Sequence, residues 1–407
     1  MAKAKIDSFL KSLRNKTGST SIKESRYGEV TTWISTGSLA LNRILSGSIR
    51  KGIPSGRITI LAGETSTGKS LLAGLIMSNA LKQGFDHIFY FDAEGGGSSE
   101  FFENIGCDSS KIEQILVSSV EEAQIRILEV YNGIKELKAS MKETDEEPPK
   151  FLCVLDSLGA LVAEKLLADA DKGKVASEMG GRSKKINNMI KAITIPALET
   201  DTAMICINHV YDDPAAMFAG KIKNQGGGKG LQYMGAINVQ CTKLLEKDEE
   251  KDSEQFYSGT HLRFFTIKNR FARPSLECDV YLDFKKGFVR PFESLWDEAI
   301  RGGFILNPKQ GYYTVPSWKE PEKMFRQSQI CSSPEIWKSF LKQFDEWSIN
   351  DLKYQKIGSD EENLETLSVE DIEIPTESNE SEEVETTTEE VSEEVIETKR
   401  GRKKKGE

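Results

Sequence analysis

The chain contains 407 residues and carries a formal net charge of −10, since 64 acidic residues outnumber 54 basic ones. Hydrophobic residues make up 38% of it, an ordinary share for a globular protein, and the length allows two or three domains. A run of about 18 apolar residues and a secretory signal are both missing, so we expect a cytoplasmic protein without a membrane-spanning helix. Six scattered cysteines and three histidines show no metal-ligand spacing, which argues against structural zinc. The net acidity by itself argues against a nucleic-acid partner.

The charge is divided unevenly along the chain. Residues 358–398 contain 17 acidic residues and no Lys or Arg, and the last nine residues contain six bases and one acid. The tail 358–407 therefore carries −12 and the preceding body +2. A segment rich in Glu, Ser and Thr without aromatic residues cannot bury enough apolar surface to fold. We expect a disordered acidic tail with a basic end, which either keeps the protein soluble or competes with a polyanion for a basic groove.

The first predicted element is an amphipathic helix over residues 4–14. Its apolar side chains recur at helical spacing and are Ile6, Phe9, Leu10 and Leu13. A polar linker follows, so that residues 1–30 form a predicted arm that packs on its own core or on a neighbouring subunit. A second short helix is expected at 39–45.

Residues 31–290 alternate short apolar runs with helical patterns. Continuous runs, typical of strands buried on both faces of a parallel sheet, lie at 58–62, 88–92, 151–156 and 203–207. Helical patterns lie between or before them at 69–83, 120–138 and 183–199. Later runs are closer to alternating and predict an antiparallel extension at 236–241, 262–268 and 278–284. The order predicts an α/β core with a mainly parallel, doubly wound sheet, followed by a small C-terminal α/β region at 291–357.

Residues 63–70, GETSTGKS, fit the P-loop pattern G-x-x-x-x-G-K-[ST] between a predicted strand and a predicted helix. Backbone N–H groups of such a loop surround a phosphate at a helix N-terminus. We expect Lys69 to reach the β- and γ-phosphates of ATP and Ser70 to coordinate Mg²⁺. The candidate nucleotide-binding residues are Gly63, Glu64, Thr65, Ser66, Thr67, Gly68, Lys69 and Ser70.

Carboxylates follow two further predicted strands. Asp92 and Glu94 come at the end of the run 88–92, where ligands bind in open α/β sheets. Either carboxylate could polarise the water that attacks ATP, and their spacing alone does not choose between them. Asp156 follows a run of apolar residues and fits the Walker-B pattern, which holds Mg²⁺ through water, while Ser157 could help to position that water.

The strand predicted at 203–207 ends in Asn208 and His209, and His209 could contact the γ-phosphate or be a purely structural histidine. Two loops rich in glycine and lysine are expected at 164–185 and 211–232, on the same edge of the sheet as the nucleotide. Long loops inside a compact domain are usually functional or disordered. Cations, glycines and backbone amides suit a phosphodiester backbone, so the candidate DNA-binding residues are Lys174, Arg182, Lys184, Lys221, Lys223, Gly226, Gly227, Gly228 and Lys229.

Lys268 and Arg270 are separated by one residue and therefore point from one face of a predicted strand. Two cations at a strand end could stabilise γ-phosphate charge across a subunit boundary, as an arginine finger does. On spacing alone the pair is a basic strand end.

These motifs, in this order, resemble the RecA-type strand-exchange recombinases, and most closely the UvsX recombinases of T-even-like phages. The resemblance covers residues 34–313. It rests on ISTGSLAL, LAGETSTGKS, FYFDAEGG, VLDSLGAL, KVASEMGGRSKK, INHVYDD with GGGKGLQY, IKNR and GFILNPKQGYY.

The resemblance implies a role for each matching residue. It implies that Glu94 is the general base, that Phe101 stacks on adenine and that Asp156 is the Walker-B acid. His209 falls at the phosphate-sensing position, and Lys268 and Arg270 fall where the family inserts cations into the neighbour's ATP site. The two glycine loops match the DNA-binding loops, and the N-terminal helix matches an arm that docks on the next protomer.

The sequence therefore predicts an ATP- and Mg²⁺-dependent DNA recombinase that forms a helical filament on single-stranded DNA and pairs it with double-stranded DNA. A single-strand-binding protein and a recombination mediator are the further partners that the resemblance implies. Two alternatives are a hexameric RecA-fold helicase, against which DAEG and DSLGAL argue, and a non-catalytic mediator. The presence of Lys69, Glu94 and Asp156 argues against the mediator.

Overall fold

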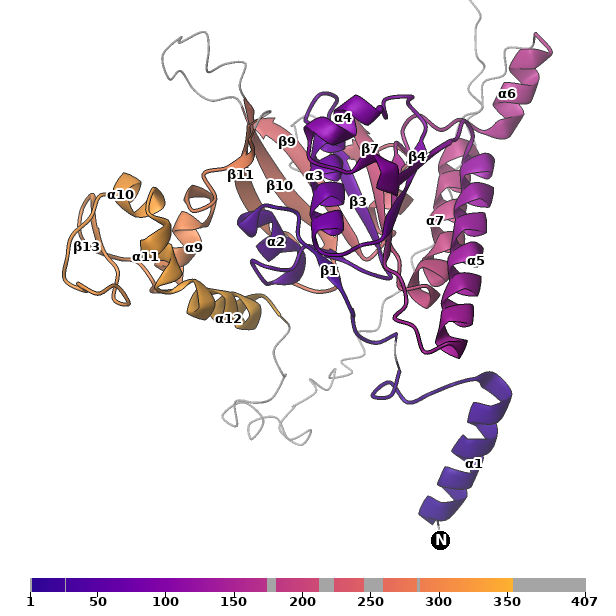
Figure 1. Cartoon of the computed structure of the whole chain (residues 1–407), viewed down its shortest axis with the longest axis horizontal. Helices are drawn as coiled ribbons and strands as arrows, with labels where there is room; N and C mark the ends of the chain where they lie inside the picture. The colour runs from indigo at the N-terminus through magenta and orange to yellow at the C-terminus, as the bar shows by residue number, and fades with distance from the viewer. Residues whose placement is uncertain are drawn as a thin grey trace, which may run out of the picture. The chain divides into compact units, whose positions relative to one another are not determined.

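The computed structural model describes residues 2–25, 27–173, 181–211, 223–244, 259–283 and 286–353 (Figure 1). Residues 1–355 form one compact unit. The acidic tail predicted from residue 358 lies outside the described residues. Within the part of the chain that is described, no helix is both long enough and apolar enough to cross a membrane.

A ten-stranded sheet organises the fold, with strands in the order β12-β11-β10-β9-β3-β7-β6-β4-β5 and with β8 paired to β7. The strands are β3 (Ile58–Gly63), β4 (His87–Asp92), β5 (Ile112–Leu116), β6 (Phe151–Asp156), β7 (Ala203–Tyr211), β8 (Asn224–Gln225), β9 (Ile237–Leu244), β10 (Gly259–Asn269), β11 (Glu277–Asp283) and β12 (Gly287–Val289). The six strands from β9 to β5 run parallel, whereas β10, β11 and β12 are antiparallel. The predicted mainly parallel α/β sheet is confirmed.

Two strands differ from the sequence-based expectation. β9 was expected in the antiparallel extension, but it pairs parallel with β3 and antiparallel with β10, and its first five residues are buried as in a central strand. β5 has no counterpart among the predicted strands, because as an edge strand it is largely exposed and shows no continuous apolar run.

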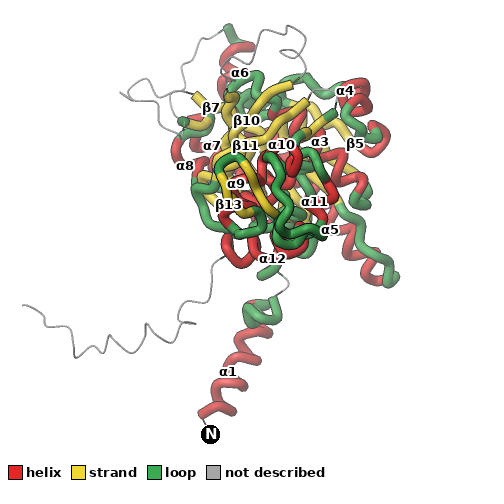
Figure 2. The backbone as a smooth tube through the Cα atoms, turned by 90° about the vertical axis from the view of Figure 1, so that its left-hand side faces the viewer, coloured by secondary structure: helices red, strands yellow, loops and turns green. Residues whose placement is uncertain are grey.

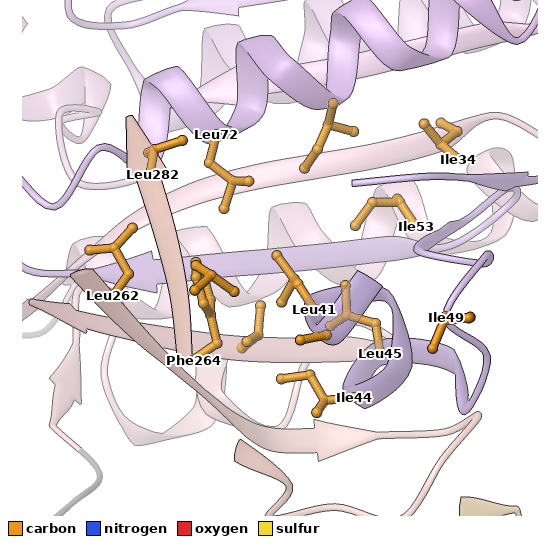
Figure 3. Packing of buried hydrophobic residues seen from close by; sticks show 14 of the residues in the cluster. Ile34, Leu41, Ile44, Leu45, Ile49, Ile53, Leu72, Leu262, Phe264 and Leu282 are labelled. Carbon is orange, nitrogen blue, oxygen red and sulfur yellow. The ribbon is translucent and has the colours of Figure 1, made fainter. Parts of the chain in front are cut away.

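Helices cover both faces of the sheet. On one face α5 (Val120–Glu143) and α7 (Gly181–Glu199) lie side by side and share one apolar cluster with the sheet (Figure 1). On the other face α2 (Leu39–Ser46) and α3 (Lys69–Lys82) share a second cluster, part of which Figure 3 shows. Because each central strand contributes side chains to both clusters, its residues are apolar without alternation.

Shorter elements complete the core. These are β1 (Trp33–Ile34), β2 (Ile53–Pro54), α4 (Ser99–Asn104), the 3₁₀ turn η1 (Ser109–Lys111), α6 (Glu164–Asp171) and α8 (Lys229–Gln232). The segment 164–185 was expected to be a loop, yet α6 and the first turns of α7 make both of its ends helical. The predicted N-terminal helix is present as α1 (Ala2–Thr17), and its Ile6 and Phe9 are 56% and 62% exposed.

The C-terminal elements pack against α2. They are η3 (Glu293–Leu295), α9 (Trp296–Arg301), β13 (Leu306–Lys309), β14 (Tyr312–Thr314), α10 (Gln327–Cys331), α11 (Pro334–Lys338) and α12 (Leu341–Leu352), and Figure 2 shows them grouped in front of the sheet. Their apolar side chains belong to the same cluster as those of α2 and α3. One apolar core therefore runs across the domain boundary predicted near residue 290.

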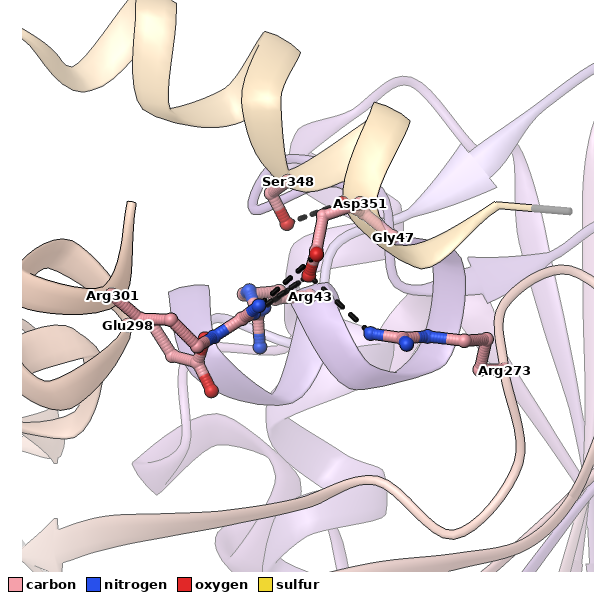
Figure 4. A network of polar contacts seen from close by, with 7 residues as sticks. All are labelled: Arg43, Gly47, Arg273, Glu298, Arg301, Ser348 and Asp351. Atoms are coloured by element: carbon pink, nitrogen blue, oxygen red, sulfur yellow. Dashed lines mark hydrogen bonds and ion pairs between the residues drawn. The ribbon is translucent and has the colours of Figure 1, made fainter. Parts of the chain in front are cut away.

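A network of charged side chains joins α2, α9 and α12 at this junction (Figure 4). Asp351 accepts hydrogen bonds from Arg301 at 2.6 and 3.0 Å, and Arg273 lies 3.4 Å away. Arg43, only 3% exposed, donates to Glu298 at 3.0 Å. A buried guanidinium needs such partners, because an unpaired charge inside the protein is costly.

Candidate nucleotide and DNA site

The P-loop joins β3 to α3, as the sequence predicts. A Cβ atom on Gly63 would lie 2.4 Å from Sγ of Cys241, so only glycine allows the loop to leave the sheet this close to β9. Gly68 precedes the helix with φ 76°, a left-handed conformation that favours glycine. The Lys69 ammonium is buried and donates to the carbonyl oxygen of Glu64 at 2.6 Å. Burial lowers the pKa of Lys69, although nearby acidic groups oppose this shift.

Glu94, Ser157 and His209 meet at the ends of three neighbouring strands. Glu94 Oε1 accepts a hydrogen bond from Ser157 Oγ at 2.5 Å and lies 3.1 Å from His209 Nε2. Burial alone would raise the pKa of Glu94, but the hydrogen bonds from Ser157 and His209 and the charge of Lys69 outweigh it, so the pKa is lowered. The side chain of Glu94 is 42% exposed, and its Oε2 has no hydrogen-bond partner among the described residues.

Gly159 packs directly against His209, since a Cβ there would lie 2.4 Å from Cδ2 of the ring. The histidine is therefore held between Gly159 and Glu94. Its own carbonyl oxygen accepts the N–H of Gly226 at 2.9 Å. Asn208 Nδ2 donates to the carbonyl of the same glycine at 2.9 Å. The second glycine loop, 211–232, is thus hydrogen-bonded through Gly226 to β7 at Asn208 and His209.

The buried carboxylate of Asp92 is used to hold the chain that follows it. Oδ1 accepts the N–H groups of Glu94 and Gly95 at 3.0 and 2.7 Å. Oδ2 accepts the N–H of Gly97 at 3.0 Å and Nε2 of Gln114 at 2.8 Å. Burial would raise the pKa of Asp92, but these donors outweigh it and lower the pKa. All four bonds lie within the protein, which favours Glu94 over Asp92 as the group that meets a water.

Asp156 ends β6 deep in the site. Its carboxylate accepts a hydrogen bond from the Tyr90 hydroxyl at 3.0 Å, and the Ser70 hydroxyl lies nearby. Burial raises its pKa, and these two hydroxyls oppose the shift. A carboxylate beside a hydroxyl supplies the oxygen ligands that Mg²⁺ prefers, and Mg²⁺ commonly takes only one or two protein ligands together with phosphates and water. The residues present therefore fit the predicted Mg²⁺ site.

Phe101, the residue expected to stack on adenine, lies on α4. Its ring is 5.3 Å from that of Phe102, and it lies near Gly74 of the P-loop helix. The aromatic side chain is partly buried and lies on the helix that follows the Glu94 loop. The stacking itself stays a prediction.

Lys268 and Arg270 lie beside the start of β3, at the opposite end of the strands from the P-loop. Asn269 pairs with Ile237, which pairs with Thr59 at the start of β3. From Thr59 to Gly63 the strand rises about 13 Å at roughly 3.3 Å per residue, farther than an arginine side chain reaches back. Arg270 therefore cannot serve the P-loop of its own chain.

Lys268 and Arg270 differ in their contacts. Lys268 Nζ donates to the carbonyl oxygens of Tyr233 and Gly235 at 2.6 and 2.8 Å, and burial and Arg270 lower its pKa. Arg270 is exposed and makes no hydrogen bond or ion pair with any residue that the structure describes. Arg270 is thus the cation that remains available to a neighbour.

The candidate DNA-binding residues are only partly described. Lys174 and Lys221 lie outside the described residues, as does the side chain of Lys229. Lys184 is exposed on α7, whereas the guanidinium of Arg182 donates to the carbonyl oxygens of Leu158, Gly159 and Leu161. Their contacts with DNA stay predictions.

The second segment expected to be a loop, 211–232, contains β8 and α8 in its described part, and its Lys223 contacts the nucleotide site. Lys223 forms an ion pair with Glu64 of the P-loop, and its backbone N–H donates to Gln240 Oε1 at 3.0 Å. Gly227 and Gly228 follow, with φ values of 95° and 79° that glycine adopts easily. The segment 211–232 and the P-loop are therefore in direct contact through Lys223.

A P-loop at the end of a central parallel strand, with carboxylates at the ends of neighbouring strands, defines a P-loop nucleotide-binding α/β protein. The chain matches the RecA N-terminal domain over residues 4–289 and belongs to this family. The predicted resemblance to RecA-type proteins is confirmed.

Three relatives illustrate the similarity. The chain is 27% identical to the recombination and repair protein of Enterobacteria phage T4 over 274 residues, which are 67% of this chain and 64% of that protein. It is 26% identical to the RecA protein of Mycoplasma genitalium over 280 residues, 69% and 74% of the two chains. It is also 26% identical to the RecA protein of Chlorobium chlorochromatii over 344 residues, 84% and 85% of the two chains. The alignment thus spans just under two thirds of the phage protein's length.

Sequence reasoning missed three contacts of the site. It did not connect Tyr90 with Asp156, Gln114 with Asp92, or Cys241 with the P-loop. Each contact joins neighbouring strands, and it depends on a register that the sequence does not show. A tyrosine in an otherwise apolar buried strand was the one available signal, because a buried tyrosine hydroxyl usually needs a partner.

Proposed function

We propose that the protein is an ATP-dependent DNA recombinase that forms a helical filament on single-stranded DNA and promotes pairing with homologous duplex DNA. The observation that carries this proposal is that the catalytic groups are separated between the two opposite ends of the strands of one sheet. Lys69, Glu94 and Asp156 lie at the carboxyl ends of the parallel strands, and Arg270 lies exposed at their opposite ends. A site of this kind is completed by a second copy stacked head to tail, and such a heterologous contact propagates into a filament.

The residues at the end of the sheet that holds the P-loop can bind and activate ATP. Lys69 and the backbone N–H groups of the loop bind the phosphates, and Oε2 of Glu94 can take a proton from a water aligned with the γ-phosphate. A bound Mg²⁺ would neutralise phosphate charge. Ser157 and His209 fix the orientation of Glu94, and Arg270 from the next protomer would stabilise charge on the transferred phosphoryl group.

The same residues can connect the nucleotide with DNA. His209 contacts Glu94 through its ring and the glycine loop through its carbonyl oxygen, and Lys223 joins that loop to Glu64. A change at the γ-phosphate would therefore be transmitted to the segment expected to bind DNA. The protein would bind the phosphodiester backbone through cations and amides, while base pairing reads homology.

A mixing experiment tests the proposed assembly. Lys69→Ala should abolish ATP binding, and Arg270→Ala should abolish turnover while ATP binding persists. In a random equal mixture about one quarter of the interfaces would combine an intact P-loop with an intact Arg270, so turnover should recover to about a quarter of the wild-type value. Failure of the mixture to recover, with both variants present in filaments, would show that Arg270 does not act on the neighbour's site.

Electron microscopy separates the recombinase from the hexameric helicase alternative. With single-stranded DNA and a non-hydrolysable ATP analogue, we expect open helical filaments. Closed rings would favour a helicase, and ATP binding without DNA-stimulated turnover would favour a non-catalytic mediator. Added single-strand-binding protein should compete for the DNA, which is why a mediator is among the proposed partners.

A further inference from the structure

Tyr90 on β4 is a buried tyrosine that points into the nucleotide site. Its side chain is 4% exposed, and its hydroxyl donates to Asp156 Oδ2 at 3.0 Å across the pairing of β4 with β6. Asp156 and Ser70 are the proposed Mg²⁺-holding residues. Tyr90 therefore touches the metal-holding carboxylate from behind, on the protein side.

Packing fixes the direction of this hydroxyl. A Cβ on Gly97 would lie 2.8 Å from Cε1 of the Tyr90 ring, so the segment 95–97 after β4 covers one side of the ring closely. Phe102 meets the ring edge to face, with centroids 5.1 Å apart and an interplanar angle of 78°. The ring is held between these residues with its hydroxyl directed at Asp156.

The Tyr90 hydroxyl donates to the buried Asp156 carboxylate from within the protein. Ser70 is exposed at the start of α3 and is itself a proposed metal ligand. Tyr90 is therefore the group placed to orient the carboxylate from the protein side.

We propose that Tyr90 is a positioning residue of the Mg²⁺–nucleotide site, which holds the Asp156 carboxylate in the orientation that meets the metal's hydration shell. This inference rests on the proposed function, because it takes Asp156 and Ser70 as the groups that hold Mg²⁺ with ATP. Partners behind a metal ligand typically change metal affinity or activity by about 10- to 100-fold when removed.

The test is the variant Tyr90→Phe, which removes only the hydroxyl and keeps the ring between Gly97 and Phe102. The readout is binding of a fluorescent N-methylanthraniloyl ATP analogue titrated with Mn²⁺. We expect the half-saturating Mn²⁺ concentration to rise by about tenfold or more. Binding of the analogue in EDTA should stay unchanged, and turnover at limiting Mg²⁺ should be rescued by excess Mg²⁺.

Tyr131→Phe is the matched control. Tyr131 is a buried tyrosine of α5 that belongs to the apolar cluster on the other face of the sheet. The control should keep the wild-type Mn²⁺ midpoint. If the role of Tyr90 is merely structural, Tyr90→Phe should lower thermal stability. The ratio of the half-saturating Mn²⁺ concentration to the dissociation constant in EDTA should then stay as in the wild type.

The outcomes separate the inference from the proposed function. If the wild-type protein binds the analogue with no dependence on metal, the proposed function fails regardless of Tyr90. If the wild type depends on metal and Tyr90→Phe has the same midpoint, the inference is overturned. Should Tyr90→Phe not fold, Phe102→Leu is the second variant, because it loosens the packing of the Tyr90 ring and keeps the Tyr90 hydroxyl. A smaller rise of the half-saturating Mn²⁺ concentration is expected for it. An unchanged midpoint in that variant overturns the inference as well.

Discussion

Replacing Asp92 with asparagine tests whether the charge of its carboxylate holds the segment 94–97, which presents Glu94. The variant keeps the shape of the side chain, and its amide oxygen can retain the N–H bonds of Glu94 and Gly95. Its NH₂ group, however, faces two donors, Gly97 and Gln114. Hydrogen bonds to a charged group contribute about 1.5–3 kcal/mol each, and Gln114 can recover one bond by turning its amide. We therefore expect a loss of about 2–4 kcal/mol in the free energy of unfolding.

The assay is urea unfolding followed by tryptophan fluorescence. Asp297→Asn is the control, because Asp297 is exposed and has no hydrogen bond among the described residues. The lowered pKa of Asp92 means that its contribution is present at neutral pH and is lost as the pH falls through that pKa. The gap between wild type and variant should therefore shrink in acid. A gap of zero at pH 7, or one that does not depend on pH, would refute the reasoning.

Two further predictions use other parts of the structure. Gly159→Ala should push His209 away from Glu94 and lower ATP turnover while nucleotide binding persists, whereas Gly96→Ala, which meets open space, should be nearly silent in the same assay. Asp351→Asn should lower thermal stability by about 2 kcal/mol by breaking the Arg301 pair, and because that pair lowers the pKa of Asp351, the wild-type advantage should fade as the pH drops through it. An unchanged melting temperature for the Asp351 variant at neutral pH would contradict this account.

The motifs were predictable from the sequence because their chemistry is local. The P-loop needs a strand, a glycine-rich turn and a helix in immediate succession, and GETSTGKS shows all three at 63–70. The central strands were predictable because burial on both faces leaves continuous apolar runs. The exposed edge strand β5 leaves no such run and was missed.

Contacts between strands were not predictable. Whether His209 reaches Glu94, or Tyr90 reaches Asp156, depends on the order of the strands and on a register of single residues. A shift by one residue would turn each side chain to the opposite face of the sheet. The role of Asp92 was also hidden, because four donors come from backbone and from Gln114 on another strand.

Arg270 lies at the opposite end of the strands from the P-loop, and this position determines how many complete ATP sites an assembly contains. In the proposed head-to-tail assembly, a row of n subunits contains n − 1 complete sites, and one terminal subunit binds nucleotide without a partner's arginine. Turnover per subunit should then rise with the length of the row and approach a plateau. Short oligonucleotides should give a lower specific activity than long ones even when every subunit is bound to DNA.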